Sequence, residues 1–376
     1  MYPVIKELYI KNFKSLTSFT INNAYPYSIF AGANGAGKSN FFDALDFVGT
    51  IIRNGIDESI KNFGGFDNIH SVKFRKENAR TFEFNISIKY PNKKEAREDN
   101  VCKYSLTIKN LDKSTYIEET ISDNDKKIWH RQKEKILIFN GEEKTAEYPP
   151  QFSIIQFLRL GNLRFLHDIL TNLKVYRIDP FGAKEPNRAD KDASSLDSKG
   201  HNLVSVLNRL EKDEDTRESI KEFMELFVPG LISLQTEHQK LDGRKVLTFK
   251  EESSPKVFPA HLVSDGTIYA LNLLVAILDN SNKAGITLIE EPERGLHPKL
   301  VTEIINLIRE KSHHNHWIWI TTHNETFVRY SKPEELWFIE KVEGSTSAKK
   351  PAFLKDGKLS LDVAWLSNSL GGGLPW

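Results

Sequence analysis

Gly32-Ala33-Asn34-Gly35-Ala36-Gly37-Lys38-Ser39 decides the fold of this chain, because it is a complete G-x-x-x-x-G-K-[ST] loop. The apolar stretch Tyr27–Ala31 precedes the loop, and a helix-compatible run over residues 40–48 follows it. In that strand–loop–helix context such a loop cradles the phosphates of a nucleoside triphosphate. The sequence therefore predicts an α/β P-loop fold that binds a nucleoside triphosphate.

The residues of this loop have separate chemical tasks. The glycines leave out side chains where backbone N–H groups must turn toward phosphate oxygens. Lys38 can reach the β- and γ-phosphates, and the Ser39 hydroxyl can ligate Mg²⁺. We therefore expect the nucleotide to contact Asn34, Gly35, Ala36, Gly37, Lys38, Ser39 and Asn40.

Composition excludes several classes of protein. The chain has 376 residues, enough for one large or two ordinary domains. Its 52 Lys and Arg residues against 51 Asp and Glu residues leave a net charge of +1, so no bulk charge favours nucleic acid or an anionic membrane. Cys102 is the only cysteine, so no intramolecular disulfide can form. Without a signal-peptide pattern or a long apolar run, the protein is expected to be cytoplasmic, with no membrane contact.

The hydrophobic pattern changes twice along the chain. Alternating apolar and polar residues predict strands over residues 4–10 and 16–21 and an antiparallel meander over residues 81–139. From Phe258 onward, helix and strand patterns alternate, which is typical of a parallel sheet. We therefore expect an N-terminal lobe with the loop and the meander at 1–150, a helical insertion at 151–250 and a C-terminal lobe at 251–376.

A second motif supplies acids. Ile286–Glu291 reads as a buried strand that ends in two carboxylates, and a sheet of this class binds its ligand at the carboxyl ends of its strands. Glu290 can then hold Mg²⁺, and Glu291 can orient or deprotonate the attacking water. The alternative is a strand that simply ends in solvated acids, which the P-loop upstream makes less favourable.

Further stretches carry a family resemblance. Val263-Ser264-Asp265-Gly266-Thr267 resembles the signature loop of ABC-type ATPases, and residues 290–298 resemble their Walker B and D-loop run. Residues 319–324 resemble the strand and switch histidine, and residues 8–15 are similar to the start of RecF/SMC-like heads. Together these stretches resemble the predicted ABC-type AAA ATPases of the RecF/OLD group, many of which are encoded in bacterial anti-phage operons.

The resemblance implies an ABC-type ATPase head: an N-terminal antiparallel β lobe, a parallel core sheet and an inserted helical subdomain. It implies ATP and Mg²⁺ as ligands, with Lys38, Glu291 and His323 as catalytic residues and with Ser39 and Glu290 at the metal. It also implies a homodimer, or a higher oligomer, that sandwiches ATP. In that dimer Ser264, Asp265 and Gly266 of one subunit would contact the nucleotide held by the other.

Some positions stay open at the level of sequence. The glutamine that senses Mg²⁺ in this family would be Gln151 or Gln156, because both lie where the first lobe passes into the helical part. Lys14 and Ser15 either contact nucleotide or form an exposed turn. Glu290 stands where aspartate is usual, and the signature loop lacks its second glycine and its glutamine, so hydrolysis is expected to be slow.

Three biological roles fit the resemblance. The first is a sensor or regulator in an anti-phage defence system of the abortive-infection type, with a separate nuclease or toxin as effector; we see neither an appended Toprim nuclease domain nor a long coiled coil. The second is a RecF-like DNA-repair ATPase on duplex DNA, although the lysines and arginines are interleaved with acids rather than gathered in a stripe. The third is an ATP-dependent scaffold with little turnover.

Overall fold

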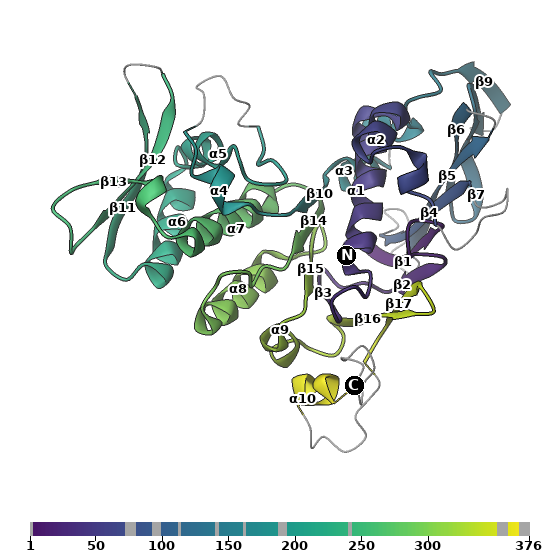
Figure 1. Ribbon diagram of the computed structural model, residues 1–376. Coiled ribbons are helices and arrows are strands. Elements are labelled where there is room, and N and C mark those ends of the chain that lie inside the picture. Colours follow the sequence, from purple (N-terminus) through teal and green to yellow (C-terminus); the bar gives the residue numbers. More distant parts are fainter. Residues whose placement is uncertain are drawn as a thin grey trace.

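A computed structural model of the chain describes residues 3–71, 80–91, 99–111, 114–139, 143–160, 163–186, 194–239, 243–351 and 360–367. Three sheets organise these residues (Figure 1): a central six-stranded sheet, an eight-stranded antiparallel sheet on one side and a three-stranded sheet on the other. The α-helices are α1 Lys38–Asn54, α2 Ile56–Asn62, α3 Arg164–Thr171, α4 Pro180–Ala183, α5 Leu203–Leu210, α6 Glu214–Phe227, α7 Asp265–Ser281, α8 Pro298–Lys311, α9 Glu325–Arg329 and α10 Leu361–Leu366.

The central sheet has the strand order β10-β14-β15-β3-β16-β17, and all neighbours are parallel except β16 and β17. Its middle strands are apolar and buried on both faces, as expected for a parallel sheet covered by helices. Alternate side chains pack on α1 on one face and on α7 and α8 on the other. The strands are β10 Leu173–Tyr176, β14 Gly285–Glu290, β15 His316–Thr322, β3 Tyr27–Ala31, β16 Leu336–Val342 and β17 Ser345–Lys349.

The eight-stranded sheet is the antiparallel meander that the sequence predicts, extended by the two N-terminal strands. Its order is β2-β1-β4-β5-β6-β7-β8-β9, and its inward side chains join the core beneath α1 and α3. The strands are β1 Val4–Lys11, β2 Phe19–Asn22, β4 Thr81–Tyr90, β5 Asn100–Leu111, β6 Ser114–Asp123, β7 Lys126–Gln132, β8 Lys135–Phe139 and β9 Glu143–Glu147.

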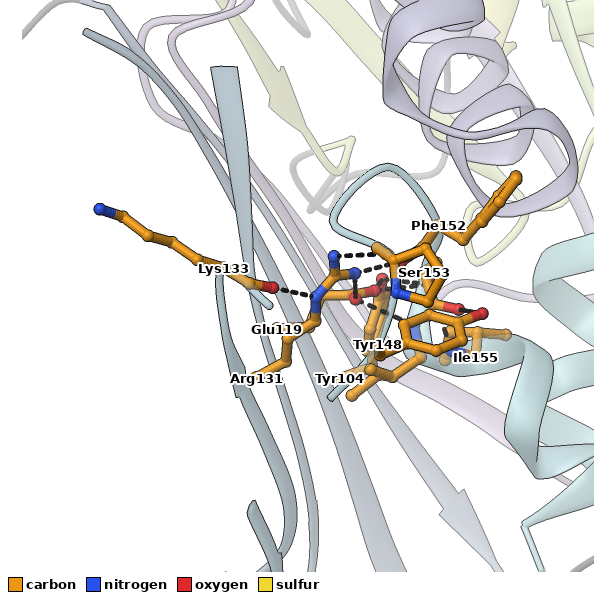
Figure 2. Close-up of polar contacts among 10 residues, drawn as sticks. Tyr104, Glu119, Arg131, Lys133, Tyr148, Phe152, Ser153 and Ile155 are labelled. Atoms are coloured by element: carbon orange, nitrogen blue, oxygen red, sulfur yellow. Dashed lines mark hydrogen bonds and ion pairs between the residues drawn. The ribbon is translucent and has the colours of Figure 1, made fainter. Parts of the chain in front are cut away.

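A buried ion pair fastens this meander to the connector that follows it (Figure 2). Arg131 on β7 contacts Glu119 on β6 at 3.1 Å, and both side chains are fully buried. The guanidinium nitrogen that contacts Glu119, Nη1, also donates to the Phe152 carbonyl, while Nη2 and Nε donate to the carbonyls of Pro149 and Lys133. Glu119 in turn accepts from the Tyr104 hydroxyl, the Ser153 hydroxyl and the Ile154 N–H. The connector is therefore fixed by polar groups that all find partners inside the protein.

The segment 151–250, expected as a helical insertion, holds short strands as well as helices. The 3₁₀ helix η3 Ile154–Leu160 leads into α3, and β10 is the edge strand of the central sheet. Next come α4, α5 and α6, then β11 Leu231–His238 and β12 Lys245–Glu251, which form a sheet with β13 Phe258–Pro259. The chain leaves β10 at the carboxyl edge of the central sheet, beside the end of β14. Across the described ranges, every helix is too short or too polar to span a bilayer.

Candidate functional site: a nucleotide site at the carboxyl edge of the central sheet

The phosphate-binding loop joins β3 to α1 and leaves the N-terminus of that helix without a cap. Gly37 occupies the N-cap position, no side chain caps α1, and its first turn holds no acidic residue. The N–H groups of an uncapped first turn and the helix dipole favour an anion. Ser264, His297 and Asn324 by contrast cap their own helices α7, α8 and α9. Among these helix starts, α1 is the one prepared for phosphate.

Close packing at two positions explains the glycines of the loop. A Cβ atom on Gly37 would lie 2.1 Å from the Thr346 hydroxyl, and Gly37 has a φ of 101°. A Cβ atom on Gly32 would lie 2.5 Å from the Ile339 carbonyl oxygen. The Thr346 hydroxyl donates to the Ala36 carbonyl at 2.9 Å. The β16–β17 hairpin therefore holds the loop in shape from beneath.

Lys38 spans the loop. Its ammonium group donates to the backbone carbonyls of Gly32 at 2.7 Å and Ala33 at 3.0 Å, and the residue is 6% exposed. Burial lowers the pKa of Lys38, and the negative charges of Glu290 and Glu291 partly oppose that shift. The cation is thus held directly beside the backbone that would surround a phosphate.

The two predicted metal ligands meet. The Ser39 hydroxyl lies 3.2 Å from Oε2 of Glu290, across the gap between α1 and β14. Adjacent ligands of an octahedral Mg²⁺ ion at about 2.1 Å from the metal are about 3 Å apart, so this pair fits that ion. Among the described residues, no three His, Cys, Asp or Glu side chains are placed so that they could hold a metal ion by themselves. A hydroxyl and one carboxylate, completed by phosphate and water, are the usual set for a nucleotide-bound Mg²⁺.

Arg177 is a site residue that the sequence reasoning missed. It follows β10, which lies parallel to β14, so it sits at the same edge of the sheet as Glu290. Its guanidinium contacts Glu290 at 2.9 Å and Asp43 at 2.5 Å, and it lies 3.7 Å from Asp46. Lys14 also contacts Asp43, at 2.6 Å. The signal available in the sequence was a basic residue at the end of a strand that neighbours the acidic strand.

Arg177 also explains how glutamate serves at position 290. Its Nε donates to Oε1 of Glu290 at 2.9 Å, while the other carboxylate oxygen, Oε2, faces Ser39. The additional methylene of glutamate therefore lets one oxygen reach Arg177 while the other stays at the predicted metal position.

The structure brings Glu291 and His323 together. Nδ1 of His323 lies 3.1 Å from Oε1 of Glu291, and both side chains are partly exposed. Glu291 has a φ of +47°, a left-handed conformation that residues other than glycine rarely adopt. Such strain persists where surrounding contacts enforce it, and it concentrates at functional sites.

Glu293 lies buried behind this pair and was not foreseen. Its Oε1 accepts from the Thr322 hydroxyl at 2.6 Å and from the His323 N–H at 3.4 Å. Its Oε2 has no hydrogen-bond partner among the described residues. Burial raises the pKa of Glu293, although the bond from Thr322 and the nearby His323 oppose that shift. Glu293 therefore orients the backbone that carries His323.

The predicted signature residues lie at the N-terminus of α7, where Asp265 and Gly266 line a cavity together with Arg177. The Ser264 hydroxyl accepts from the Thr267 N–H at 3.2 Å and caps α7. Asp265 pairs with Lys184, whose ammonium also donates to the Val263 carbonyl at 2.7 Å. Within the described part of the chain, no hydrogen bond or ion pair joins residues 264–267 to residues 32–39. The two halves of the expected nucleotide pocket are therefore not joined within one chain.

Neither candidate glutamine lies at the phosphate loop. Gln156 donates to the Ile52 carbonyl at 2.5 Å, and the Gln151 carbonyl accepts from the Ile56 N–H. Ile52 is three turns or more along α1 from Ser39, a distance of about 20 Å at 1.5 Å per residue. The expectation for Gln151 or Gln156 is therefore corrected, because both sit at the far end of that helix. The residue that the structure places beside Glu290 at this edge of the sheet is Arg177, directly after β10.

Lys14 and Ser15 line a cavity beside the loop. The cavity measures about 580 Å³ and is shared with Asn40, His70 and residues of the β16–β17 turn. Ser15 is 8% exposed and accepts from the Asn40 amide at 2.7 Å. Ser15 is therefore not part of an exposed turn, and a nucleotide contact of Lys14 and Ser15 stays a prediction.

Comparisons with known proteins agree with this geometry. A model of the family described as "AAA domain, putative AbiEii toxin, Type IV TA system" matches residues 28–329. No curated protein matches the chain in sequence. Two solved structures share its fold. One is an SMC head bound to the C-winged helix domain of ScpA, with 16% identity, a TM-score of 0.56 and coverage of 96% of this chain and 99% of that one. The other is an SMC head with an extended coiled coil bound to the C-terminal domain of ScpA derived from Pyrococcus furiosus, with 15% identity, a TM-score of 0.54 and coverage of 96% and 98%.

The likeness to the SMC heads confirms the predicted fold class, a P-loop ATPase head of the ABC type. The family model spans well over half of the sequence. The chain therefore belongs to this AAA-domain family, and its fold is that of the SMC heads.

Proposed function

We propose that the protein binds MgATP at this edge of the sheet and hydrolyses it slowly. The observation that carries the proposal is the 3.2 Å approach of Ser39 to Glu290 at the uncapped start of α1. Glu291 and His323 stand next to these ligands on the neighbouring strand ends. Phosphate, metal and water thus each have a group of the right chemistry at one sheet edge.

Each residue then has one task. Lys38 and the first-turn N–H groups of α1 hold the β- and γ-phosphates, and bound Mg²⁺ neutralises their charge. Glu291 accepts a proton from, or orients, the attacking water, and His323 contacts the γ-phosphate from the adjacent strand end. The cavity beside Lys14 and Ser15 has room for the nucleoside, since ligand pockets of about 300–1,000 Å³ are typical.

The proposal includes a dimer that forms on ATP. Ser264, Asp265 and Gly266 lie at the N-terminus of α7, and among the described residues no hydrogen bond or ion pair joins them to their own phosphate loop. A second copy, related by a two-fold axis, would place this turn on the nucleotide held by the first. ATP would then join the heads, and hydrolysis at Glu291 would release them.

For the biological role we propose a cytoplasmic sensor or regulator in an anti-phage defence system with a separate nuclease or toxin effector. The family description, with its reference to a type IV toxin–antitoxin system, supports a defence-type setting. A DNA-repair role is less well supported, because lysines on the outer face of the meander pair with acids. Such pairs are Lys11–Glu83, Lys103–Asp125 and Lys109–Glu118.

The catalytic part is tested with purified wild-type protein, Lys38→Ala and Glu291→Gln. We expect Mg²⁺-dependent phosphate release from the wild type only. Lys38→Ala should weaken ATP binding about 100-fold, or about 2.7 kcal/mol. Glu291→Gln should keep ATP binding, lose about 10²–10⁴-fold in hydrolysis and accumulate as an ATP-bound dimer in light scattering. Unchanged phosphate release by Glu291→Gln would favour the scaffold with little turnover.

The biological part is tested by expression in bacteria. Growth arrest by this chain alone, abolished by Lys38→Ala, would show that the chain is itself the toxin and would remove the separate effector. Arrest only when a neighbouring gene is co-expressed would support the proposal. DNA binding by the purified protein that weakens steeply with salt would favour the repair clamp.

A further inference from the structure

A hydrogen bond ties the signature helix to the residue that we assign to water activation. Tyr269 lies one turn into α7, and its hydroxyl donates to the backbone carbonyl of Glu291 at 2.8 Å. Tyr269 is 3% exposed and packs in the apolar core under the central sheet. Burial raises the pKa of Tyr269 further, so its hydroxyl stays protonated and can donate at any working pH.

This bond acts on a strained residue. Glu291 has its φ at +47°, and its own N–H donates to the Thr321 carbonyl on β15 at 3.0 Å. The peptide group before Glu291 is thus fixed by β15. The carbonyl of the peptide group after it accepts from Tyr269 and also from the Arg294 N–H at 3.0 Å. Together these bonds hold the backbone turn that directs the Glu291 carboxylate toward His323, and Tyr269 is the one that reaches it from α7.

A second contact joins the same two segments. A Cβ atom on Gly266 would lie 2.9 Å from the Gly295 carbonyl oxygen, so the first turn of α7 packs on the loop after β14 with no side chain between them. Because these two segments are in close contact, a shift of one displaces the other. A displacement at the start of α7 therefore reaches the loop that begins at Glu291.

We propose that Tyr269 is a positioning residue for Glu291 and relays movement of the signature turn to it. The inference rests on the proposed ATP hydrolysis and goes one step further. In the proposed dimer, the signature turn touches the partner's nucleotide while Glu291 acts on its own. Tyr269 then makes hydrolysis in each subunit depend on whether the other nucleotide has engaged the signature turn.

The first experiment compares Tyr269→Phe with the matched control Tyr104→Phe. Both variants remove one hydroxyl from a buried ring, and Tyr104 donates to Glu119 in the meander, away from the site. We expect Tyr269→Phe to lower kcat about 10- to 100-fold, because misplacement of a catalytic group by about 1 Å has effects of that size. The KM for ATP should stay within about twofold. Tyr104→Phe should keep kcat within about twofold, whatever its melting temperature.

A second experiment tests the relay itself by combining Tyr269→Phe with Ser264→Ala. If the signature turn acts on Glu291 through Tyr269, the double variant should lose little more kcat than the worse single variant. A loss equal to the product of the two single losses would overturn the relay. A Tyr269→Phe enzyme with wild-type kcat would overturn the positioning role, while an inactive wild type would overturn the proposed hydrolysis and this inference with it.

Discussion

Two arginine–glutamate pairs in this molecule share their chemistry and differ in their surroundings. Arg131 and Glu119 are fully buried in the meander, where all three guanidinium nitrogens and both carboxylate oxygens find partners (Figure 2). Arg177 and Glu290 lie at the edge of the central sheet, with side chains 35% and 16% exposed. In the first pair the protein satisfies every polar group itself.

The second pair leaves capacity for a ligand. Oε2 of Glu290 faces a serine hydroxyl alone, and Arg177 neutralises the acids that surround the start of α1. A closed polar network fixes one structure, whereas an open one can exchange partners when phosphate and metal arrive. The same type of ion pair therefore serves folding in one place and, under the proposed function, binding in the other, and variants of each arginine separate the two effects.

The largest expected effect is on stability, from Arg131→Met. This change leaves the Glu119 carboxylate buried without its cation, which costs about 3–5 kcal/mol in the free energy of unfolding. Urea unfolding followed by circular dichroism measures that loss. The folded fraction should hydrolyse ATP within about twofold of the wild type.

The paired replacement sharpens this result. Arg131→Met combined with Glu119→Gln removes both charges, so it should recover a good part of the lost stability. A single variant that unfolds within about 1 kcal/mol of the wild type would contradict the view that this pair fastens the connector.

Arg177→Met should show the opposite pattern. We expect ATP affinity to fall about tenfold, or about 1.4 kcal/mol, because Asp43, Asp46 and Glu290 would face the triphosphate without their shared cation. Stability should change by about 1 kcal/mol or less, since the pair is partly exposed. Isothermal titration with a slowly hydrolysed ATP analogue measures the affinity.

Arg309→Met is the matched control for that loss. Arg309 is 31% exposed and pairs with Glu335 at 2.9 Å. It lies in the last turn of α8. That helix leads into the amino end of β15, whereas the site lies at the carboxyl ends of the strands. Its ATP affinity should stay within about twofold. Equal losses in the two variants would mean that Arg177 acts through general charge and not through its position.

The smallest effect concerns Glu293, which is buried like Glu119 but has no arginine. Burial raises the pKa of Glu293 above its ordinary 4.5, so the folded protein holds a proton there that the unfolded chain releases. This contribution to stability is complete below pH 4.5 and is lost as pH rises through the folded pKa. Glu293→Gln mimics the protonated acid, so its stability relative to the wild type should increase with pH.

Urea unfolding of Glu293→Gln at pH 4.5, 6 and 7.5 checks the sign of this effect. Glu303→Gln, on the exposed face of α8, serves as the control with no expected trend. If the difference between Glu293→Gln and the wild type is constant over this range, the buried acid does not take up the proton.

Candidate site residues that lie within one short motif could be predicted from the sequence. Lys38 and Ser39 follow a buried strand, and Glu290 and Glu291 end another, so strand–loop–helix rules sufficed to predict them. The alternation of residues over 81–139 likewise predicted the meander, which the structure confirms.

The remaining site residues depend on which strands and helices become neighbours. Arg177 matters because β10 pairs with β14, and Tyr269 matters because α7 packs against the loop after β14. Neither adjacency is visible in periodicity. The glutamine was misplaced for the same reason: Gln156 lies near the lobe boundary in sequence, but its amide is used at the far end of α1.

The β16–β17 hairpin that braces the phosphate loop is synthesised much later than the loop itself. Thr346 bonds to Ala36 across 310 positions and to Ser15 across 331. A ribosome releases the glycine loop long before the hairpin that braces it, and N-terminal segments begin to fold first. A nascent polypeptide therefore carries the motif without its brace, and under the proposed function nucleotide capture waits until the β16–β17 hairpin has been synthesised.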